Sequence, residues 1–257
     1  MISPEAIVDP DAHISDSATV GAFSIIGADV EIGGGSVIGS HTVIKGPTKI
    51  GKNNKVFQFC SIGDDPQDKK YDGESQSILE IGDNNVIREY CSINRGTAQG
   101  GGVTRLGDNN WIMAYVHIAH DCLIGNHCTF ANNTTLAGHV LVEDYVILGG
   151  FTGVHQFCRL GKHSFSAISS VIVKDVPPYI MMSGNTAKPT GLNREGLKRH
   201  GFPTDSIDIL RKAYKLIYRD GMLLKDALEE VRTLEQHCPQ LIDFIKFIEA
   251  SDRGIAR

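Results

Sequence analysis

The sequence predicts a mainly β fold: a prism of short parallel strands followed by a small helical domain. Three observations support this prediction. An aliphatic residue recurs at every sixth position over much of the chain, and glycine is frequent, at 28 of 257 residues, without the every-third-residue period of collagen. Beyond Pro177-Pro178 the apolar residues change to helical spacing.

The six-residue repeat begins at Val8 and runs without a miss to Ile62. It resumes from Ile81 to Ile93 and again from Leu106, where the last run has one break, at Ser166. A period of six matches neither an α-helix nor a simple alternating strand. It matches a prism with three short strands per turn and about eighteen residues per coil. We therefore expect each aliphatic residue to point to the axis, and the small residue that tends to follow four positions later to fill a second inward position.

The cysteines follow the same repeat. Five of the six lie four residues after an aliphatic repeat position: Cys60, Cys91, Cys122, Cys128 and Cys158. We interpret them as core residues, because free cysteine is commonly buried. Their spacing is not that of a zinc finger, and thiols stay reduced in the cytoplasm, so zinc ligands and disulfides are disfavoured.

Charge and hydropathy exclude several classes of protein. The formal net charge is −5, whereas general nucleic-acid binders need Lys and Arg to displace counterions. No apolar run approaches the roughly 18 residues of a membrane span, and the N-terminus has neither a basic leader nor an apolar stretch of signal-peptide length. We expect a soluble cytoplasmic protein with no nucleic-acid partner and no stable membrane insertion.

Two segments interrupt the repeat. Residues 63–80 and 94–105 are polar or glycine-rich, so we expect both to loop out of the prism, where long loops are commonly functional. We divide the chain into a β domain, residues 1–187, and a helical domain, residues 188–257.

Three helices are expected in the helical domain. Thr204 is placed as the N-cap of the first, and Gly221 follows its end. The second covers the region of residues 224–234, and the third begins near Pro239, a favourable first-turn residue. The apolar residues that indicate these helices are Ile207, Leu210, Tyr214 and Ile217, then Leu224, Leu228, Val231 and Leu234, then Leu241, Phe244, Ile245 and Ile248.

A polar cluster after residue 115 carries the candidate chemistry. Residues eighteen apart lie on successive coils about 4.8 Å apart, the spacing of strands in a sheet. His120 is therefore expected to stack with Gly138 and Gln156, and Asp121 with His139. A base, a carboxylate, a second imidazole, a backbone N–H group and an amide then meet on one edge. Such a set can deprotonate a hydroxyl group and stabilise an oxyanion.

Two alternatives to this catalytic interpretation stay open on spacing alone. The first is polar stacking along the edge of a non-catalytic scaffold. The second is a zinc site of the kind found in gamma-class carbonic anhydrases, with His117, His120 and His139 as ligands, although the spacing does not demand it.

Several motifs along nearly the whole chain resemble those of one enzyme family. They are Gln67-Asp68-Lys69-Lys70-Tyr71, Arg95-Gly96-Thr97, His117-Ile118-Ala119-His120-Asp121, Leu136-Ala137-Gly138-His139, His155-Gln156-Phe157-Cys158, Asp175-Val176-Pro177-Pro178-Tyr179 and Asn193-x-Glu195-Gly196-Leu197-Lys198-Arg199. They are similar to motifs of the hexapeptide-repeat UDP-N-acetylglucosamine O-acyltransferases that begin lipid A biosynthesis. The resemblance implies a left-handed parallel β-helix, an exception to the usual right-handed crossover, assembled as a homotrimer with active sites between subunits.

The resemblance also implies a reaction and roles for residues. A 3-hydroxyacyl chain would pass from the phosphopantetheine of acyl carrier protein to the 3-hydroxyl of UDP-N-acetylglucosamine, with no metal and no cofactor of the enzyme's own. His120 would be the general base, Asp121 would orient it, and the N–H group of Gly138 would stabilise the oxyanion. The substrate contacts would be Gln67, Asp68, Lys70, His117, His139, His155 and Gln156, with Asn193, Glu195, Arg199 and His200 around the nucleotide.

The chain departs from the family pattern in two places. His200 stands where a second arginine is common, so an imidazole replaces a permanently charged guanidinium near the diphosphate. Asn94 replaces a usual histidine, which we expect to be harmless because it lies outside the stacked cluster. The N-acyltransferase of the same pathway is a less similar relative, since it carries an N-terminal uridine-binding domain for which a repeat beginning at Val8 leaves no room.

Two further expectations concern the acyl donor. Arg211, Lys212, Lys215 and Arg219 share a helix face away from the apolar stripe, which suits docking of an acidic carrier protein. Ile168 falls where the family has an acyl-chain ruler, a residue whose size limits the length of the acyl chain. Its bulk predicts a donor of about ten to twelve carbons, because a close-packed groove cannot hold both the isoleucine side chain and the last methylenes of a longer chain. The alternative is that Ile168 turns toward the core and compensates for Ser166.

Overall fold

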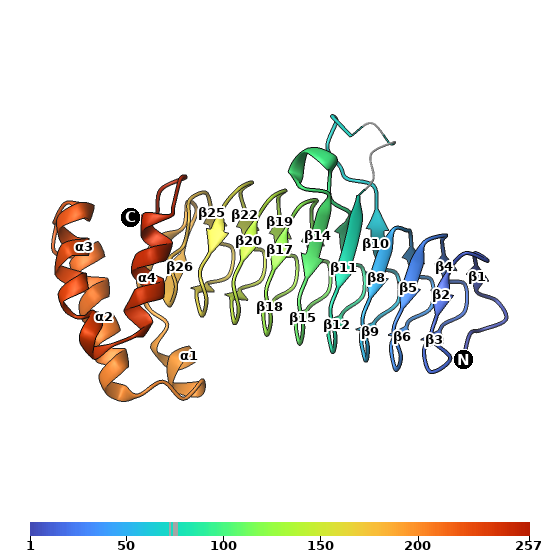
Figure 1. Ribbon diagram of the computed structural model, residues 1–257, viewed down its shortest axis with the longest axis horizontal. Helices are drawn as coiled ribbons and strands as arrows, with labels where there is room; N and C mark the ends of the chain where they lie inside the picture. The colour runs from blue at the N-terminus through green and yellow to red at the C-terminus, as the bar shows by residue number, and fades with distance from the viewer. Residues whose placement is uncertain (72, 74–76) are drawn as a thin grey trace.

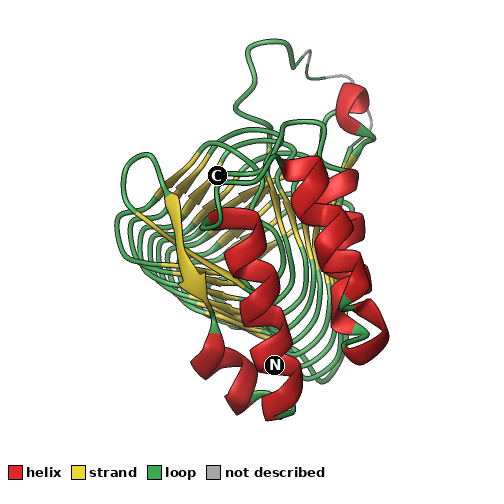
Figure 2. Cartoon of the chain, turned by 90° about the vertical axis from the view of Figure 1, so that its left-hand side faces the viewer, coloured by secondary structure: helices red, strands yellow, loops and turns green. Residues whose placement is uncertain are grey.

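The protein is a parallel β-helix followed by helices at its C-terminal end (Figure 1). The computed structural model describes residues 1–71, 73 and 77–257. Each turn of the chain adds one strand to each of three sheets, so the expected prism is confirmed. Figure 2 shows the stacked coils roughly end on, with the helices in front of them.

The strands are short and pair with strands of the neighbouring coils. The first sheet contains β1 (Ile7–Val8), β4 (Ile25–Ile26), β7 (Val43–Ile44), β10 (Ser61–Asp64), β13 (Ser92–Asn94), β16 (His117–Ile118), β19 (Thr135–Leu136), β22 (Gly153–Val154) and β25 (Val171–Ile172). The second contains β2 (His13–Ile14), β5 (Val30–Ile32), β8 (Thr48–Ile50), β11 (Ile78–Ile81), β14 (Val103–Leu106), β17 (Leu123–Ile124), β20 (Leu141–Val142) and β23 (Arg159–Leu160). The third contains β3 (Thr19–Val20), β6 (Val37–Ile38), β9 (Lys55–Val56), β12 (Val86–Ile87), β15 (Trp111–Ile112), β18 (Thr129–Phe130), β21 (Ile147–Leu148), β24 (Phe165–Ser166), β26 (Ile180–Ser183) and β27 (Lys188–Leu192), of which β26 and β27 pair antiparallel.

The repeat positions line the axis of the prism. Ile26, Ile44 and Ile62 pair in register on successive coils, and all three are buried. The break in the repeat does not change the register, because Ser166 is buried and pairs with Leu148. The oxygen atoms of the Ser166 and Thr152 hydroxyls are 2.9 Å apart, so this polar residue is satisfied inside the core.

The second inward position is filled as expected. All six cysteines are free and buried, which confirms the core interpretation of the five in the repeat. Elsewhere the position holds a ladder of asparagines. The side-chain oxygens of Asn54, Asn85 and Asn110 each accept a hydrogen bond from a backbone N–H group of the following coil, at 2.7–2.9 Å. Because these buried amides are paired, they fix the register of one coil on the next.

Both insertions leave the β-helix on the same side (Figure 1). Strands β10 and β13 end at Asp64 and Asn94, and strands β11 and β14 begin at Ile78 and Val103. The insertions are therefore residues 65–77 and 95–102, somewhat shorter than the expected segments 63–80 and 94–105. The four-residue strands β10, β11 and β14, together with the last residue of β13, account for the difference. The second insertion contains the short 3-10 helix η1 (Ala98–Gly100).

The C-terminal helices are α1 (Arg194–Arg199), α2 (Thr204–Tyr218), α3 (Leu224–Thr233), the 3-10 helix η2 (Glu235–His237) and α4 (Gln240–Glu249). The three expected helices correspond to α2, α3 and α4. Helix α1 was not expected, because six residues with one buried side chain, Leu197, show no periodicity. Among the described residues, no helix combines the length and apolarity needed to cross a bilayer.

Two expected boundaries differ from the structure. The placement of Thr204 as an N-cap is wrong, since Thr204 is the first residue of α2 and Pro203 occupies the cap without a side-chain hydrogen bond. A proline is suited to this entry, because its ring holds φ near the helical value. In addition, strand structure continues past residue 187 through β27, which pairs with β26.

Candidate active site

Two columns of residues on one corner of the β-helix form the candidate active site. Strands β16, β19 and β22 pair in register through Ile118, Leu136 and Val154. The residues two and three positions later are therefore aligned, which confirms the expected stacking. The first column contains His120, Gly138 and Gln156, and the second contains Asp121, His139 and Phe157.

His120 and Asp121 form a buried hydrogen-bonded pair at this corner. His120 is 7% exposed and Asp121 is 5% exposed, and Nδ1 of His120 lies 2.8 Å from Oδ2 of Asp121. A carboxylate only accepts hydrogen bonds, so Nδ1 of His120 carries a proton, and in the neutral ring Nε2 then has the lone pair. The pair thus presents a basic nitrogen whose orientation is fixed by its neighbour.

The second insertion holds the carboxylate of Asp121 in place. Thr97 donates its backbone N–H group to Oδ1 at 2.8 Å and its hydroxyl group to Oδ2 at 2.7 Å. The backbone N–H group of Asp121 donates to the hydroxyl oxygen of Thr104 at 2.7 Å. The sequence motif Arg95-Gly96-Thr97 includes Thr97 but did not predict this role. Thr97 lies in an insertion, so the six-residue repeat does not relate it to either column of stacked residues.

Gly138 leaves room for the His120 imidazole. A Cβ atom at position 138 would lie 2.5 Å from Cε1 and 2.7 Å from Nε2 of His120, closer than real Cβ contacts. Among the described residues, none accepts a hydrogen bond from the N–H group of Gly138. The glycine therefore combines a close approach to the base with an available backbone donor.

The neighbouring histidines are held as neutral rings. Burial lowers the pKa of His117, and Nδ1 of this ring lies 2.7 Å from the hydroxyl oxygen of Ser92. Burial also lowers the pKa of His139, partly offset by the nearby carboxylates of Asp121 and Asp68. The His139 ring meets that of His120 edge-on, with centroids 5.2 Å apart. Neutral imidazoles each offer one donor and one acceptor to a substrate.

The first insertion carries the next group of expected site residues. Gln67 and Lys70 are exposed, and Lys70 donates its backbone N–H group to the carboxylate of Asp68 at 3.0 Å. The Asp68 carboxylate acts on the pKa of His139 in the direction opposite to burial. The base of the insertion is anchored by Asn94, whose buried amide donates to the backbone oxygen of Asp65 at 2.8 Å. Asn94 thus lies outside the two columns, as expected, yet supports the loop.

The expected nucleotide residues lie on another side of the chain. Figures 1 and 2 show α1 and the insertions on opposite sides of the β-helix. Asn193, Glu195 and Arg199 line a cavity of about 400 Å³ at the start of α1. The Asn193 amide caps α1 by accepting from the N–H group of Gly196 at 3.1 Å, and it donates to the backbone oxygen of His163 at 2.9 Å.

His200 is exposed, and one side of its ring rests on an aromatic group. Its ring meets those of Tyr145 and His163 edge-on, with centroids 4.8 Å and 5.1 Å away. Burial, together with the neighbouring His200, lowers the pKa of His163 to about 4. The residue that distinguishes this chain from the family pattern therefore contacts two aromatic rings while it stays exposed to solvent.

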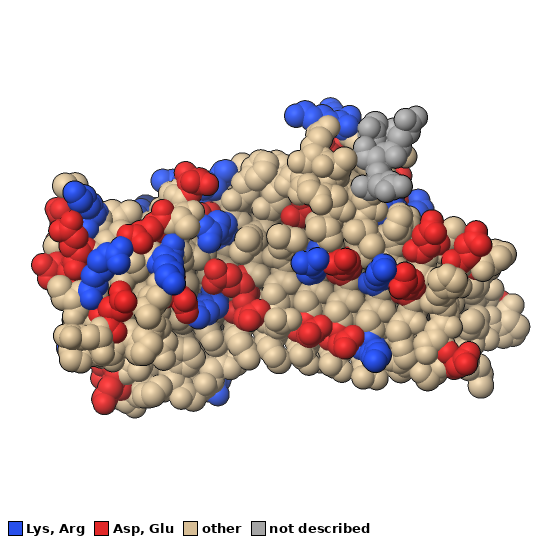
Figure 3. All heavy atoms as spheres, in the orientation of Figure 1, with Lys and Arg blue, Asp and Glu red and all other residues tan. Residues whose placement is uncertain are grey.

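The residues expected to contact the acyl donor are on the surface. Ile168 is 68% exposed, so the alternative in which it turns toward the core is wrong. The inward position remains with Ser166, whose hydroxyl is satisfied there. Arg211, Lys212 and Lys215 on α2 and Arg219 at its C-cap are all exposed, and among the described residues none of the four forms an ion pair. Figure 3 shows basic and acidic side chains intermingled over the helical end on the face it presents.

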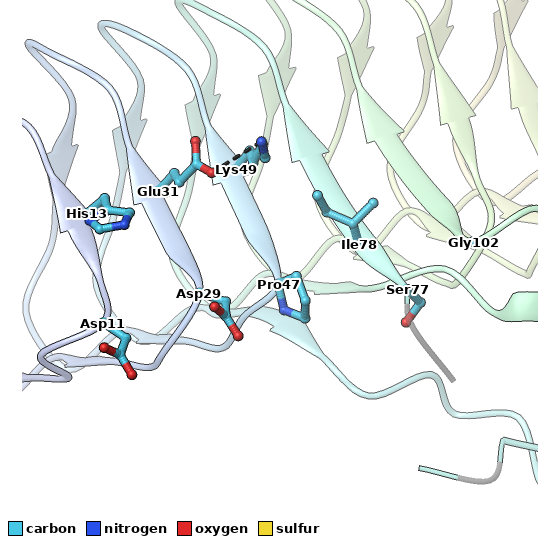
Figure 4. A pocket seen from close by; sticks show the side chains of 9 residues that line it. All are labelled: Asp11, His13, Asp29, Glu31, Pro47, Lys49, Ser77, Ile78 and Gly102. Carbon is cyan, nitrogen blue, oxygen red and sulfur yellow. Dashed lines mark ion pairs between the residues drawn. The ribbon is translucent and has the colours of Figure 1, made fainter. Parts of the chain in front are cut away.

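A hollow of about 650 Å³ lies elsewhere, beside the first coils (Figure 4). Asp11, His13 and Asp29 line it, together with the ion pair of Lys49 and Glu31, whose charged atoms are 3.1 Å apart. None of the residues expected to contact the substrates lines this hollow. It therefore does not enter the reaction considered below.

Known proteins resemble this chain over its whole length. Residues 175–256 match the family model described as UDP-N-acetylglucosamine O-acyltransferase, domain 2, and residues 5–46 and 104–138 match the bacterial transferase hexapeptide model. The acyl-[acyl-carrier-protein]–UDP-N-acetylglucosamine O-acyltransferases of Alkalilimnicola ehrlichii and Thiobacillus denitrificans are 58% and 54% identical, and the alignments cover 100% of this chain and 99% of each relative.

Solved structures of similar proteins lead to the same family as the sequence relatives. The UDP-N-acetylglucosamine acyltransferase of Francisella novicida is 46% identical, with a TM-score of 0.97 over 100% of this chain and 94% of that one. The expected fold class, a left-handed parallel β-helix with a C-terminal helical region, is confirmed. The chain therefore belongs to the family of acyl-[acyl-carrier-protein]–UDP-N-acetylglucosamine O-acyltransferases.

Proposed function

We propose that this enzyme transfers a 3-hydroxyacyl chain from acyl carrier protein to the 3-hydroxyl of UDP-N-acetylglucosamine, the first step of lipid A biosynthesis, by general-base catalysis. The names of its relatives support the substrates. The observation that carries the mechanism is the buried His120–Asp121 pair, clamped by Thr97, with its free Nε2 beside Gly138.

In the proposed reaction, Nε2 of His120 takes the proton of the sugar hydroxyl as its oxygen attacks the thioester carbonyl. Asp121 stabilises the imidazolium that forms. The backbone N–H group of Gly138 donates to the oxyanion of the tetrahedral intermediate. When the intermediate collapses, the carbon–sulfur bond breaks and His120 returns the proton to the departing phosphopantetheine thiol, so the enzyme ends in its starting state.

This reaction uses no metal and no cofactor of the enzyme's own. The zinc alternative has one supporting observation, since ligand atoms of His120, Asp121 and His139 lie within 4.8 Å of one another. A metal there would compete with existing hydrogen bonds, because Thr97 and His120 already occupy the Asp121 carboxylate. His117, the third ligand expected from the sequence, is outside this compact group. These contacts favour general-base chemistry over a zinc site.

The positions of the substrate residues support a homotrimer. Helix α1 lies on the side of the β-helix opposite the insertions, and the second insertion contacts the catalytic corner through Thr97 and Asp121. In this proposal one UDP-sugar reaches both sets of residues because α1 comes from a second copy. A contact between two different surfaces of identical chains closes into a ring when the rotation permits. A ring of three matches the assembly that the resemblance implies, and in this proposal the enzyme acts in the cytoplasm.

Replacement of His120 tests the general base. His120→Ala is expected to lower kcat at least about 100-fold, the effect typical of a lost general base, without loss of the trimer. His41→Ala is the matched control, because His41 also lies at a corner but stacks with Phe23 and Phe59 on the first coils, away from the site. Turnover by His120→Ala equal to that of the parent would remove His120 from the mechanism and favour the scaffold alternative. Inactivation of the parent by chelators would favour the zinc site.

Charge reversal on α2 tests the carrier-protein surface. Because an acidic carrier would be attracted to this face, Arg211→Glu combined with Lys215→Glu is expected to raise the KM for acyl carrier protein about tenfold. UDP-N-acetylglucosamine binding is expected to stay unchanged. The control reverses Lys52 and Lys55, two exposed lysines of the β-helix, with the same change in net charge. An unaltered carrier KM would mean that these α2 residues form an ordinary solvated helix face.

Substitution of Ile168 tests the acyl-chain ruler. The exposed Ile168 side chain is expected to limit the parent to donors of about ten to twelve carbons, since a groove filled by its methyl groups excludes further methylenes. Ile168→Gly should shift the preference toward fourteen carbons, measured as kcat/KM with matched 3-hydroxyacyl carrier proteins. A parent that already prefers fourteen carbons, with no shift in the glycine variant, would show that Ile168 is not the ruler.

A further inference from the structure

The C-terminal tail is docked on the last coils of the β-helix. After α4 the chain returns to strand-like pairing with Asp175. The backbone N–H group of Asp175 donates to the backbone oxygen of Gly254 at 3.2 Å, and the backbone oxygen of Asp175 accepts from the N–H group of Ala256 at 2.9 Å. The hydroxyl group of Ser251 donates to the Asp175 carboxylate at 2.7 Å. Ile255 and Ala256 are buried. These contacts fix residues 251–256 against the β-helix.

The docked tail brings Arg253 to His155. Nε of Arg253 donates to the backbone oxygen of Val173 at 2.8 Å, and one terminal nitrogen of its guanidinium lies 2.9 Å from Nδ1 of His155. A guanidinium has five N–H donors, no acceptor, and does not lose its proton in proteins. Nδ1 of His155 must therefore be the acceptor in this contact, which leaves the proton of the neutral ring on Nε2.

His155 has a competing contact that favours the opposite tautomer. Its Nδ1 also lies 3.0 Å from the backbone oxygen of Gln156, which only accepts hydrogen bonds. With the proton on Nδ1, the ring would donate to Gln156, and Nε2 would carry the lone pair. The charge-assisted contact with Arg253 is the stronger of the two. Arg253 thus selects between two neutral forms of His155 that differ in what Nε2 offers to a ligand.

We propose that Arg253 is a positioning residue that holds His155 as a hydrogen-bond donor, through Nε2, to an oxygen atom of the UDP-sugar. This inference rests on the proposed function, in which His155 contacts the substrate. His155 directly precedes Gln156, which shares a column with Gly138 and His120. The tail therefore sets the hydrogen-bonding character of one residue at the edge of the active site.

The tautomer of His155 is measurable by ¹⁵N NMR of the ring nitrogens in the ligand-free enzyme, with His155→Ala to assign the signals. We expect Nδ1 to be pyridine-like and Nε2 to be pyrrole-like in the parent. Arg253→Met should exchange the two types, and Arg253→Lys, which keeps a cationic donor, should restore the parental pattern. Arg257→Met is the control, since Arg257 also anchors the tail, through the backbone oxygen of Ile217, but is not in contact with His155. An unchanged tautomer in Arg253→Met would overturn the proposal, whatever the enzyme's substrate.

Kinetics separate positioning from simple support of the fold. Arg253→Met is expected to raise the KM for UDP-N-acetylglucosamine about tenfold, equivalent to about 1.4 kcal/mol, with kcat nearly unchanged. In a His155→Ala background the same substitution should have no further effect, because the ring it orients is gone. An equal rise in KM on Arg253→Met in the parent and in the His155→Ala background would contradict the proposed role. So would a tautomer exchange in Arg253→Met without a change in KM.

Discussion

The in-register stacking of coils is the constraint on which the structure depends. Each coil places its residues about 4.8 Å from their counterparts on the next, and the inward isoleucines and asparagines fix that register. A side chain on one coil is then positioned by the residue eighteen later. Gly138 has to be a glycine for this reason, because the ring of His120 fills the space that a side chain there would need.

The segments outside the repeat complete the chemistry that the repeat begins. The corner supplies a base and a carboxylate, with Asp121 and His139 at positive φ values of 60° and 61°, a conformation that aspartate and histidine adopt more often than most residues. The second insertion then fixes the carboxylate through Thr97, and the C-terminal tail brings Arg253 to His155. The rigid coils determine where groups lie, and the irregular segments determine which hydrogen bonds those groups make.

The features that follow from the six-residue repeat could be predicted from the sequence. The axial residues, the buried cysteines and the stacking of His120 with Gly138 follow from counting in sixes, since a single register relates all coils. Thr97 and Arg253 were beyond this reasoning, because nothing in the repeat relates an insertion or a tail to a column. The direction of the Ile168 side chain was left open for a similar reason. With Ser166 at the repeat position, Ile168 could point outward or turn toward the core, and only packing decides between the two.

The turnover of Gly138→Ala, compared with that of Gly153→Ala, tests most directly whether stacking creates the active site. The new Cβ atom at position 138 would lie 2.5 Å from the His120 ring and displace it, whereas one at position 153 would meet no atom within 4 Å. The account predicts that Gly138→Ala loses at least about 100-fold in kcat while the protein stays folded, and that Gly153→Ala retains the parental rate. A Gly138→Ala enzyme with the parental kcat would contradict it.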